Sequence, residues 1–158
     1  LARPAAPKHK GARYVADVAA AADVVASGEG AVLLATGSKE LAAFAGRDGL
    51  VERLYPRVLP DEEVIAQVRA LGVPRSHIIA MQGPFSHEFN IAMLRQIGAA
   101  WLVTKESGAV GGQDDKIEAA LETGAVPVVI KRPLEPEDAR DFEQVCLQLT
   151  GAVPQPIQ

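Results

Sequence analysis

The sequence predicts an α/β fold: an open, doubly wound, mainly parallel five-stranded sheet with helices on both faces, as in Rossmann-like and flavodoxin-like domains. Short runs rich in Val, Ile and Leu alternate with amphipathic segments of roughly ten residues, which is the pattern of βαβ units. The apolar runs lack polar alternation, which indicates strands that are buried on both sides. The 158 residues suffice for one core, and no Pro/Gly/Ser-rich linker divides them.

The elements are predicted in alternating order along the chain. We expect strands at 31–35, 50–59, 77–82, 99–104 and 126–133, and helices at 15–26, 38–46, 61–72, 86–98, 114–124 and 135–151. Ser38 and Ser86 stand where the second and the fourth helix need an N-cap. Pro56 interrupts the second strand. Because Pro cannot donate to a sheet ladder, this strand is expected near an edge of the sheet.

One domain is expected over residues 15–151. We interpret 1–14 as the remnant of an interdomain junction and 152–158 as a frayed tail. The composition argues against several classes of protein. The net charge of −4 comes without clustered Lys and Arg, so no nucleic-acid partner is expected. No apolar run reaches the length of a membrane span, and the first residues lack the apolar core of a signal peptide.

The sequence contains few residues that suit a disulfide or a metal. Cys146 is the single cysteine, so no internal disulfide can form, which fits a reducing cytoplasm. His9, His77 and His87 are scattered without the spacing of metal ligands, so we expect no metal site.

Sheets of this kind bind ligands beyond the carboxyl ends of their strands, where loops run into helix N-termini. The first such loop carries Thr36, Gly37 and Ser38, directly after the strand at 31–35. Glycine permits a tight turn, and hydroxyls beside the free N–H groups of a helix start suit a carboxylate or a phosphate. The alternative is a plain capping turn in which Ser38 is the N-cap.

The loop after the third strand is longer than a turn requires. In "MQGPFSHEF", Gly83 and Pro84 form a rigid turn that holds the Gln82 amide over the sheet edge. Phe85 offers a flat face to a planar ligand, and Ser86 caps the following helix. A turn with Phe85 as a hydrophobic staple explains the same residues, except for Gln82.

The loop after the fourth strand, "VTKESGAVGGQDDK", combines glycines with two lysines. Glycines let backbone amides approach a ligand and Lys balances negative charge, which suits a phosphate or a polycarboxylate. The alternative is a surface loop with solvated lysines. Neither GxxxxGK[ST] nor GxGxxG occurs in the sequence, so the P-loop and dinucleotide fingerprints are absent.

These loops closely resemble those of the precorrin-6A reductase family of cobalamin (vitamin B12) biosynthesis. The matching stretches are "LLATGSKELAAFA", "RVLP", "IIAMQGPFSHEFNIAMLRQIGA", "LVTKESGAVGGQDDKIEAA" and "PVVIKRP". They lie in the family's order and cover roughly 31–133, with Ala35 where a Thr is common. Such oxidoreductases use a pyridine nucleotide to reduce one C=C bond of a macrocyclic tetrapyrrole. Precorrin-6A becomes precorrin-6B, and a related branch reduces the cobalt-bearing analogue.

The resemblance implies a two-domain enzyme. Its N-terminal Rossmann-like domain would carry most contacts to NADPH, with NADH also open, and the macrocycle would bind in the cleft between the domains. No stretch of this sequence matches that N-terminal domain, so the chain is expected to be the C-terminal domain and to be inactive on its own. The alternative is a non-catalytic α/β module that binds a tetrapyrrole or a nucleotide.

The resemblance also implies roles for the loop residues. Lys105 is the candidate catalytic residue, because a cation would stabilise the charge that develops as hydride arrives. Lys105, Ser86 or water would deliver the proton. Cofactor contacts are expected from Gln82, Gly83, Pro84, Lys105, Ser107 and Gly108. Substrate contacts are expected from Thr36, Gly37, Ser38, Phe85, Ser86, Asn90, Gly111, Gly112 and Lys116.

Overall fold

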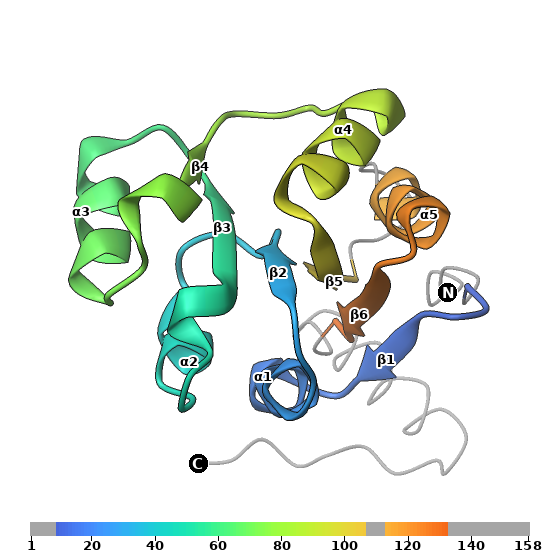
Figure 1. The fold of residues 1–158 in the computed structure, drawn as a ribbon, viewed down its shortest axis with the longest axis horizontal. Helices are drawn as coiled ribbons and strands as arrows, with labels where there is room; N and C mark the ends of the chain where they lie inside the picture. The colour runs from blue at the N-terminus through green and yellow to red at the C-terminus, as the bar shows by residue number, and fades with distance from the viewer. Residues whose placement is uncertain (1–8, 107–112, 133–158) are drawn as a thin grey trace, which may run out of the picture.

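The computed structural model describes residues 9–106 and 113–132. Within these residues, parallel strands form one six-stranded sheet in the order β1-β6-β5-β2-β3-β4 (Figure 1). The strands are β1 (Arg13–Val15), β2 (Ala31–Leu34), β3 (Leu54–Val58), β4 (Ile79–Ala80), β5 (Ala99–Lys105) and β6 (Val126–Ile130). The helices are α1 (Val18–Ser27), α2 (Leu41–Ala45), α3 (Glu62–Ala70), α4 (His87–Ile97) and α5 (Gln113–Thr123), with 3-10 turns η1 (Val51–Arg53) and η2 (Arg75–His77). The helix predicted at 135–151, the tail 152–158 and the loop glycines 108, 111 and 112 with Ser107 lie outside the described residues.

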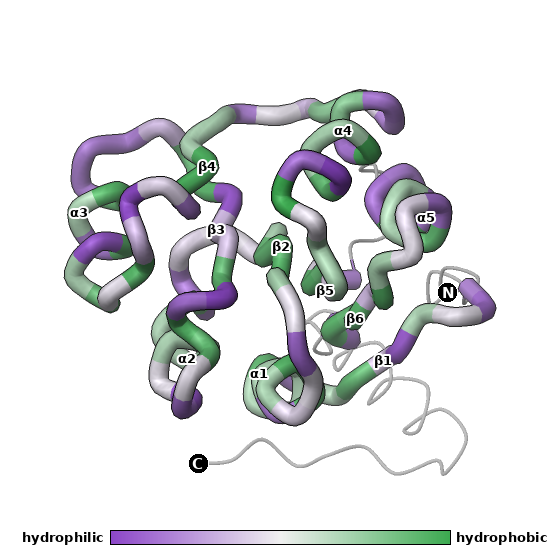
Figure 2. Tube along the Cα trace, viewed as in Figure 1, coloured by the Kyte–Doolittle hydropathy of each residue, from purple (hydrophilic) through white to green (hydrophobic). Residues whose placement is uncertain are grey.

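Helices cover both faces of the sheet, as predicted (Figure 1). Successive side chains of a strand point to opposite faces, so the central strands supply two separate cores. Val32 and Leu34 of β2 pack in a cluster with residues of α1 and α2. Leu33 of β2 and Leu102 of β5 pack instead with residues of α4 and α5. Figure 2 shows that the central strands are largely hydrophobic, which agrees with burial on both sides.

The structure adds a sixth strand to the five that were predicted. Arg13–Val15 pairs in parallel with β6, with Arg13 opposite Val128. The Arg13 guanidinium also lies over the Trp101 ring, 5.4 Å from its centroid. Three residues are too few to show a strand pattern in the sequence, so this strand depends on a distant partner rather than on a local signal.

The position of β3 explains how the sheet accommodates Pro56. β3 lies between β2 and the edge strand β4, and so near an edge of the sheet, as predicted. The Val58 carbonyl accepts a hydrogen bond from Met81 N at 2.9 Å, and residues two apart in a parallel strand face the same neighbour. Pro56 therefore faces β4 as well, but the two-residue β4 begins only opposite Arg57. The missing N–H of Pro56 thus costs no hydrogen bond between β3 and β4. The strand predicted at 77–82 is only the two-residue β4 in the structure.

Of the two predicted N-cap residues, one caps its helix and the other does not. Ser86 is confirmed as the N-cap of α4, because its Oγ accepts from Phe89 N at 3.1 Å. Ser38 is not an N-cap: α2 begins at Leu41, and Glu40 stands at the cap position without a side-chain cap bond. The Glu40 carboxylate is therefore free to reach β5. No helix in the described part of the chain is both long and apolar enough to cross a membrane.

Candidate functional site

The strand order places a topological switch point between β2 and β5. The chain continues from β2 to β3 on one side and from β5 to β6 on the other. In open α/β sheets, ligands bind at the carboxyl ends of the two strands where the order reverses. Leu34 is paired with Val103, and Ala35 N donates to the Val103 carbonyl at 2.9 Å. The segment after β2 and the end of β5 therefore lie side by side, as the sequence predicts.

Lys105 and Glu40 form an ion pair at this point. The Lys105 ammonium donates to Glu40 Oε1, with 45% of the lysine side chain and 19% of the glutamate side chain exposed. The second carboxylate oxygen, Glu40 Oε2, is buried and has no hydrogen-bond partner among the described residues, and the same holds for Thr36 Oγ1. An unsatisfied buried polar group costs about 1–3 kcal/mol, so both atoms favour a ligand or water at this place.

Glu40 was not identified from the sequence. A helix that begins at Ser38 would place Glu40 in its exposed first turn, whereas the later start at Leu41 turns the carboxylate towards β5. Thr36, Gly37 and Ser38 precede α2 as a half-buried segment. Gly37 has φ +85°, and no atom lies within 4 Å of the place where a Cβ would stand. The glycine is therefore needed for its backbone conformation, which L side chains rarely adopt.

The loop from β4 to α4 is mostly exposed. Gln82, Gly83 and Pro84 are exposed, and the Gly83–Pro84 peptide bond is cis. A Cβ on Gly83 would stand 3.1 Å from the ring of Phe85, so glycine lets this ring fold back on the loop. The Phe85 ring stacks with Phe89 at a centroid distance of 5.7 Å.

Arg57, near the end of β3, lies over the ring of Phe85 in this loop. Its guanidinium carbon is 4.0 Å from the centroid of the Phe85 ring. The residue is 7% exposed, and its Nη1 donates to Asn90 Oδ1 at 2.8 Å and to Met93 Sδ at 3.5 Å. Burial lowers the pKa of Arg57 to about 10, so it remains charged at neutral pH. No carboxylate of the described residues pairs with it. Asn90 is itself only 2% exposed, so its side-chain oxygen Oδ1 accepts from Arg57 rather than from solvent.

A second cation belongs to the same region. Lys116, in the first turns of α5, is half-buried. Burial, and then the positive charge of Arg57, lower the pKa of Lys116 below its ordinary value. β3 and α4 thus bring Arg57 and Asn90 into contact, and Lys116 of α5 is near enough for the charge of Arg57 to affect it. The sequence analysis names Asn90 and Lys116 as candidate substrate contacts but not Arg57, which stands inside a predicted strand and gives no separate signal.

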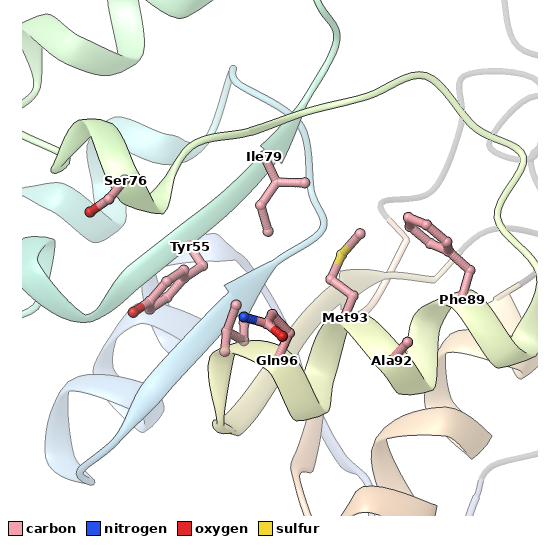
Figure 3. Close-up of a pocket in the computed structure, with 8 residues that line it drawn as sticks. Tyr55, Ser76, Ile79, Phe89, Ala92, Met93 and Gln96 are labelled. Atoms are coloured by element: carbon pink, nitrogen blue, oxygen red, sulfur yellow. The ribbon is translucent and has the colours of Figure 1, made fainter.

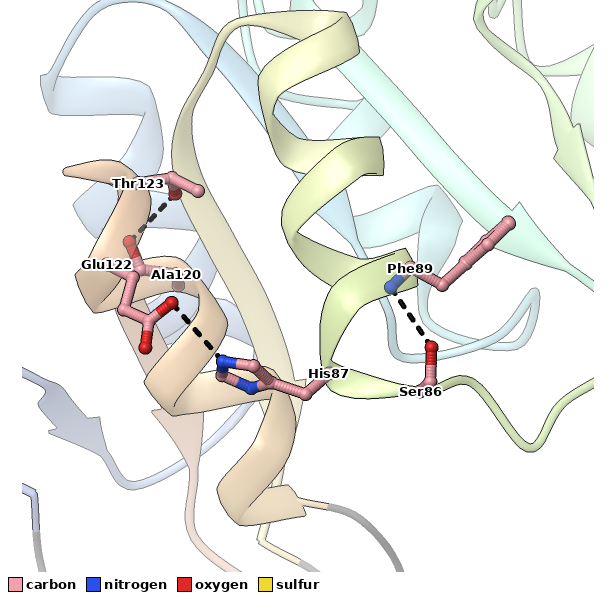
Figure 4. A network of polar contacts seen from close by, with 6 residues as sticks. All are labelled: Ser86, His87, Phe89, Ala120, Glu122 and Thr123. Atoms are coloured by element: carbon pink, nitrogen blue, oxygen red, sulfur yellow. Dashed lines mark hydrogen bonds and ion pairs between the residues drawn. The ribbon is translucent and has the colours of Figure 1, made fainter.

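Helices α4 and α5 are also joined at the surface (Figure 4). His87 Nε2 lies 3.2 Å from Glu122 Oε2. Desolvation lowers the pKa of His87, but the hydrogen bond and charge of Glu122, followed by those of Asp115, outweigh it and leave the pKa above its ordinary value. Asp115 and Glu118 lie near the imidazole, with potential ligand atoms of the three residues within 4.8 Å. His87 is half-buried and the two carboxylates are exposed, and such acidic groups are common at protein surfaces without a metal.

A pocket of about 450 Å³ lies on the face of β3 and β4 next to α4 (Figure 3). It is lined by Tyr55, Ser76, Ile79, Phe89, Ala92, Met93, Gln96 and Ile97. The pocket is separate from the Lys105–Glu40 pair, but it shares Met93 and Phe89 with the surroundings of Arg57 and Phe85. The sequence did not predict it, because it depends on how far α4 stands from the edge of the sheet.

The predicted site residues therefore fall into three groups. Thr36, Gly37, Ser38 and Lys105 meet at the switch point. Phe85 and Asn90 contact Arg57, whose charge also acts on Lys116. Gln82, Gly83, Pro84 and Ser86 belong to the loop that leads into α4. Ser107, Gly108, Gly111 and Gly112 lie outside the described residues.

The fold and this edge define a doubly wound α/β domain with polar groups gathered at the switch point, the usual ligand position of such sheets. Comparison with known proteins identifies the family. The family model described as "Precorrin-6x reductase CbiJ/CobK" matches residues 1–150. The chain belongs to this precorrin-6x reductase family, which confirms the resemblance predicted from its loops.

Individual relatives are named as precorrin-6A or cobalt-precorrin-6A reductases. The chain is 44% identical to a cobalt-precorrin-6A reductase of Priestia megaterium over 115 residues, which are 72% of this chain and 45% of that protein. It is 47% identical to the cobalt-precorrin-6A reductase of Salmonella typhimurium over 65% of this chain and 38% of that protein. The precorrin-6A reductase of Mycobacterium tuberculosis is 32% identical over 92% of this chain and 56% of that protein. The chain thus spans about half the length of the curated relatives it matches.

A solved structure has the same fold. The CobK precorrin-6A reductase structure matches with a TM-score of 0.64 over 98% of this chain and 62% of that chain. The two sequences are 23% identical, so this likeness concerns the fold alone.

Proposed function

We propose that this chain is part of a precorrin-6A reductase, an enzyme that uses NADPH to reduce one C=C bond of precorrin-6A and gives precorrin-6B in cobalamin biosynthesis. NADH and the cobalt-bearing substrate are the variants to be compared with it. The observation that carries the proposal is the family match over residues 1–150. In this proposal the chain is the C-terminal domain, and a preceding domain supplies most of the dinucleotide contacts. The single cysteine of the sequence supports a cytoplasmic location for the enzyme.

The residues at the switch point fit the reactive end of such a cofactor better than its diphosphate. Thr36 Oγ1 and Glu40 Oε2 are buried without a partner among the described residues, and the Glu40 carboxylate pairs through its other oxygen with the ammonium of Lys105. A glycine fingerprint for a diphosphate is absent from the sequence. Bound NADPH would supply the hydride for the reduction. Gln82 and Lys105 are the residues that we assign to holding its nicotinamide.

Lys105 is the residue that we assign to the chemical step. A cation at the end of β5 stabilises negative charge that develops on a conjugated acceptor, and its ammonium carries protons that can be transferred. Glu40 fixes the position of this ammonium through Oε1. Ser86 is a weaker choice as proton donor, because its oxygen already caps α4.

The test uses the full-length enzyme that contains this chain, assayed with NADPH and precorrin-6A. We expect a product heavier by two hydrogens. We expect Lys105→Met to lower kcat about 100-fold or more, which is the usual size of a lost general acid or charge stabiliser. Glu40→Gln should lower kcat less, since it removes only the positioning charge. Lys10→Met is the matched control, because Lys10 is exposed on the N-terminal turn before β1.

A Lys105→Met enzyme that keeps at least a third of the wild-type kcat would remove Lys105 from the mechanism. An enzyme that binds both NADPH and the tetrapyrrole without any turnover would instead identify a non-catalytic binding module.

A further inference from the structure

Arg57 is a buried cation whose N–H donors are only partly satisfied by acceptors of the described residues. Both of its recorded hydrogen bonds come from Nη1, to Asn90 Oδ1 and to Met93 Sδ. Guanidinium has five N–H donors in a fixed planar arrangement, so the Nε and Nη2 donors have no acceptor among the described residues. The residue as a whole is 7% exposed, so a ligand that offers acceptors to these donors would offset part of the cost of burying them.

Burying such a cation is unfavourable unless an anion or several acceptors compensate for the lost hydration. Here a second cation, Lys116, lies close enough for the charge of Arg57 to act on it. No ion pair of the described residues involves either side chain. The repulsion between these two like charges costs free energy, which an anion bound at Arg57 would relieve.

The surroundings of Arg57 fix its position. Asn90 is held in the first turn of α4, whose start is fixed by the Ser86 cap. Phe85 packs against the guanidinium and stacks on Phe89. Arg57 is thus oriented by an amide from α4 and by a ring from the preceding loop. A preorganised guanidinium of this kind suits recognition of a carboxylate or a phosphate.

We propose that Arg57 and Lys116 together bind one anionic group of the enzyme's ligands, either a carboxylate of the tetrapyrrole or a phosphate of the dinucleotide. That an anion binds here is inferred from the structure itself. That the anion belongs to the tetrapyrrole or to the dinucleotide rests on the proposed function. The neighbouring pocket favours the tetrapyrrole, because Met93 belongs both to the pocket and to the contacts of Arg57. An apolar surface beside a cation suits a flat ring that carries carboxylates.

The test is a binding experiment on the 158-residue chain with two probes. Uroporphyrin, a planar tetrapyrrole with eight carboxylates, is titrated and followed by its Soret absorption. NADPH is titrated separately and followed by its fluorescence. Both titrations are repeated with Arg57→Met, Lys116→Gln and the control Arg69→Met, whose arginine is exposed on α3. Circular dichroism verifies that each variant is folded.

We expect Arg57→Met and Lys116→Gln each to weaken the binding of one probe by about tenfold or more, the usual effect of losing a charge-assisted hydrogen bond. Arg69→Met should stay within about twofold of the wild type, because an exposed charge contributes little. Weaker uroporphyrin binding identifies the anion as a carboxylate, and weaker NADPH binding identifies it as a phosphate. Affinities for both probes that stay within twofold in both site variants, or a wild-type chain that binds neither probe, would overturn the proposal. Turnover of the full-length enzyme tests the proposed function separately and can succeed when this site fails.

Discussion

Replacing Arg57 by Met should leave the stability of the chain nearly unchanged, although it removes a buried residue with a hydrogen bond. Burial lowers the pKa of Arg57 from 12.5 to about 10, which corresponds to a cost of about 3 kcal/mol for the charged form in the folded state. Because the folded-state pKa is the lower one, this cost is present at all pH values below about 10 and decreases above it. Met removes the cost but also removes the bond to Asn90, which is worth about 1.5–3 kcal/mol. The two effects nearly cancel.

Asn90→Ala should behave differently, since it keeps the buried charge and removes its oxygen acceptor. We expect it to lower the free energy of unfolding by about 2–3 kcal/mol. The double variant Arg57→Met with Asn90→Leu, which replaces both partners by apolar groups, should again be close to the wild type. Urea unfolding measures all three, with Trp101 as the fluorescent reporter, because it is the sole tryptophan of the sequence and is 8% exposed. Equal m-values would verify that only stability changes.

The reasoning is refuted if Arg57→Met alone lowers the free energy of unfolding by more than about 3 kcal/mol, the size expected for breaking a stabilising buried pair. Arg57 would then be a structural residue, and its burial would need no ligand.

Two further predictions concern packing and pH. Gly28→Ala should destabilise the chain by about 1–3 kcal/mol and change the fluorescence of Trp101, because the new Cβ would stand 2.4 Å from Trp101 Cζ2. The backbone of Gly28 is extended, a conformation that Ala adopts without strain, so the cost comes from this contact. A cost below about 0.5 kcal/mol would contradict this packing. The raised pKa of His87 means that its ion pair with Glu122 stabilises the fold below pH 6.5 and loses this effect as the pH rises through the raised value. The Tm difference between wild type and His87→Gln should therefore shrink from about pH 6 to pH 9; a constant difference would exclude the ion pair as its cause.

Much of the fold follows from local sequence patterns. The Val- and Leu-rich runs predict β2, β5 and β6 because strands buried on both faces need continuous apolar residues. Ser86 predicts the start of α4 because its hydroxyl suits an N-cap. β1 could not be predicted, since three residues become a strand only by pairing with β6. Pro56 correctly indicates a strand near an edge, but the sequence does not show that β4 begins only opposite Arg57, which is what lets β3 have β4 as a neighbour.

The site divides in the same way. Lys105 is the last residue of β5 and Thr36 follows β2, and strand order alone brings them to one edge. Glu40 and Arg57 escaped prediction because their roles depend on partners far along the chain. Glu40 meets a lysine 65 residues later, and the amide that accepts from Arg57 stands 33 residues further on. A single sequence offers no signal for such contacts unless a motif happens to include both residues.

The central claim is that the carboxyl edge of this sheet, at the switch point between β2 and β5, binds the ligands. Hydrogen–deuterium exchange of the full-length enzyme, with and without NADPH and precorrin-6A, tests it most directly. We predict that the ligands slow amide exchange at 35–40, 81–90 and 103–106. Exchange at the opposite edge, where β2 and β5 begin at 28–31 and 98–100, should stay unchanged. Slower exchange at the opposite edge, with no change at the carboxyl edge, would contradict the account.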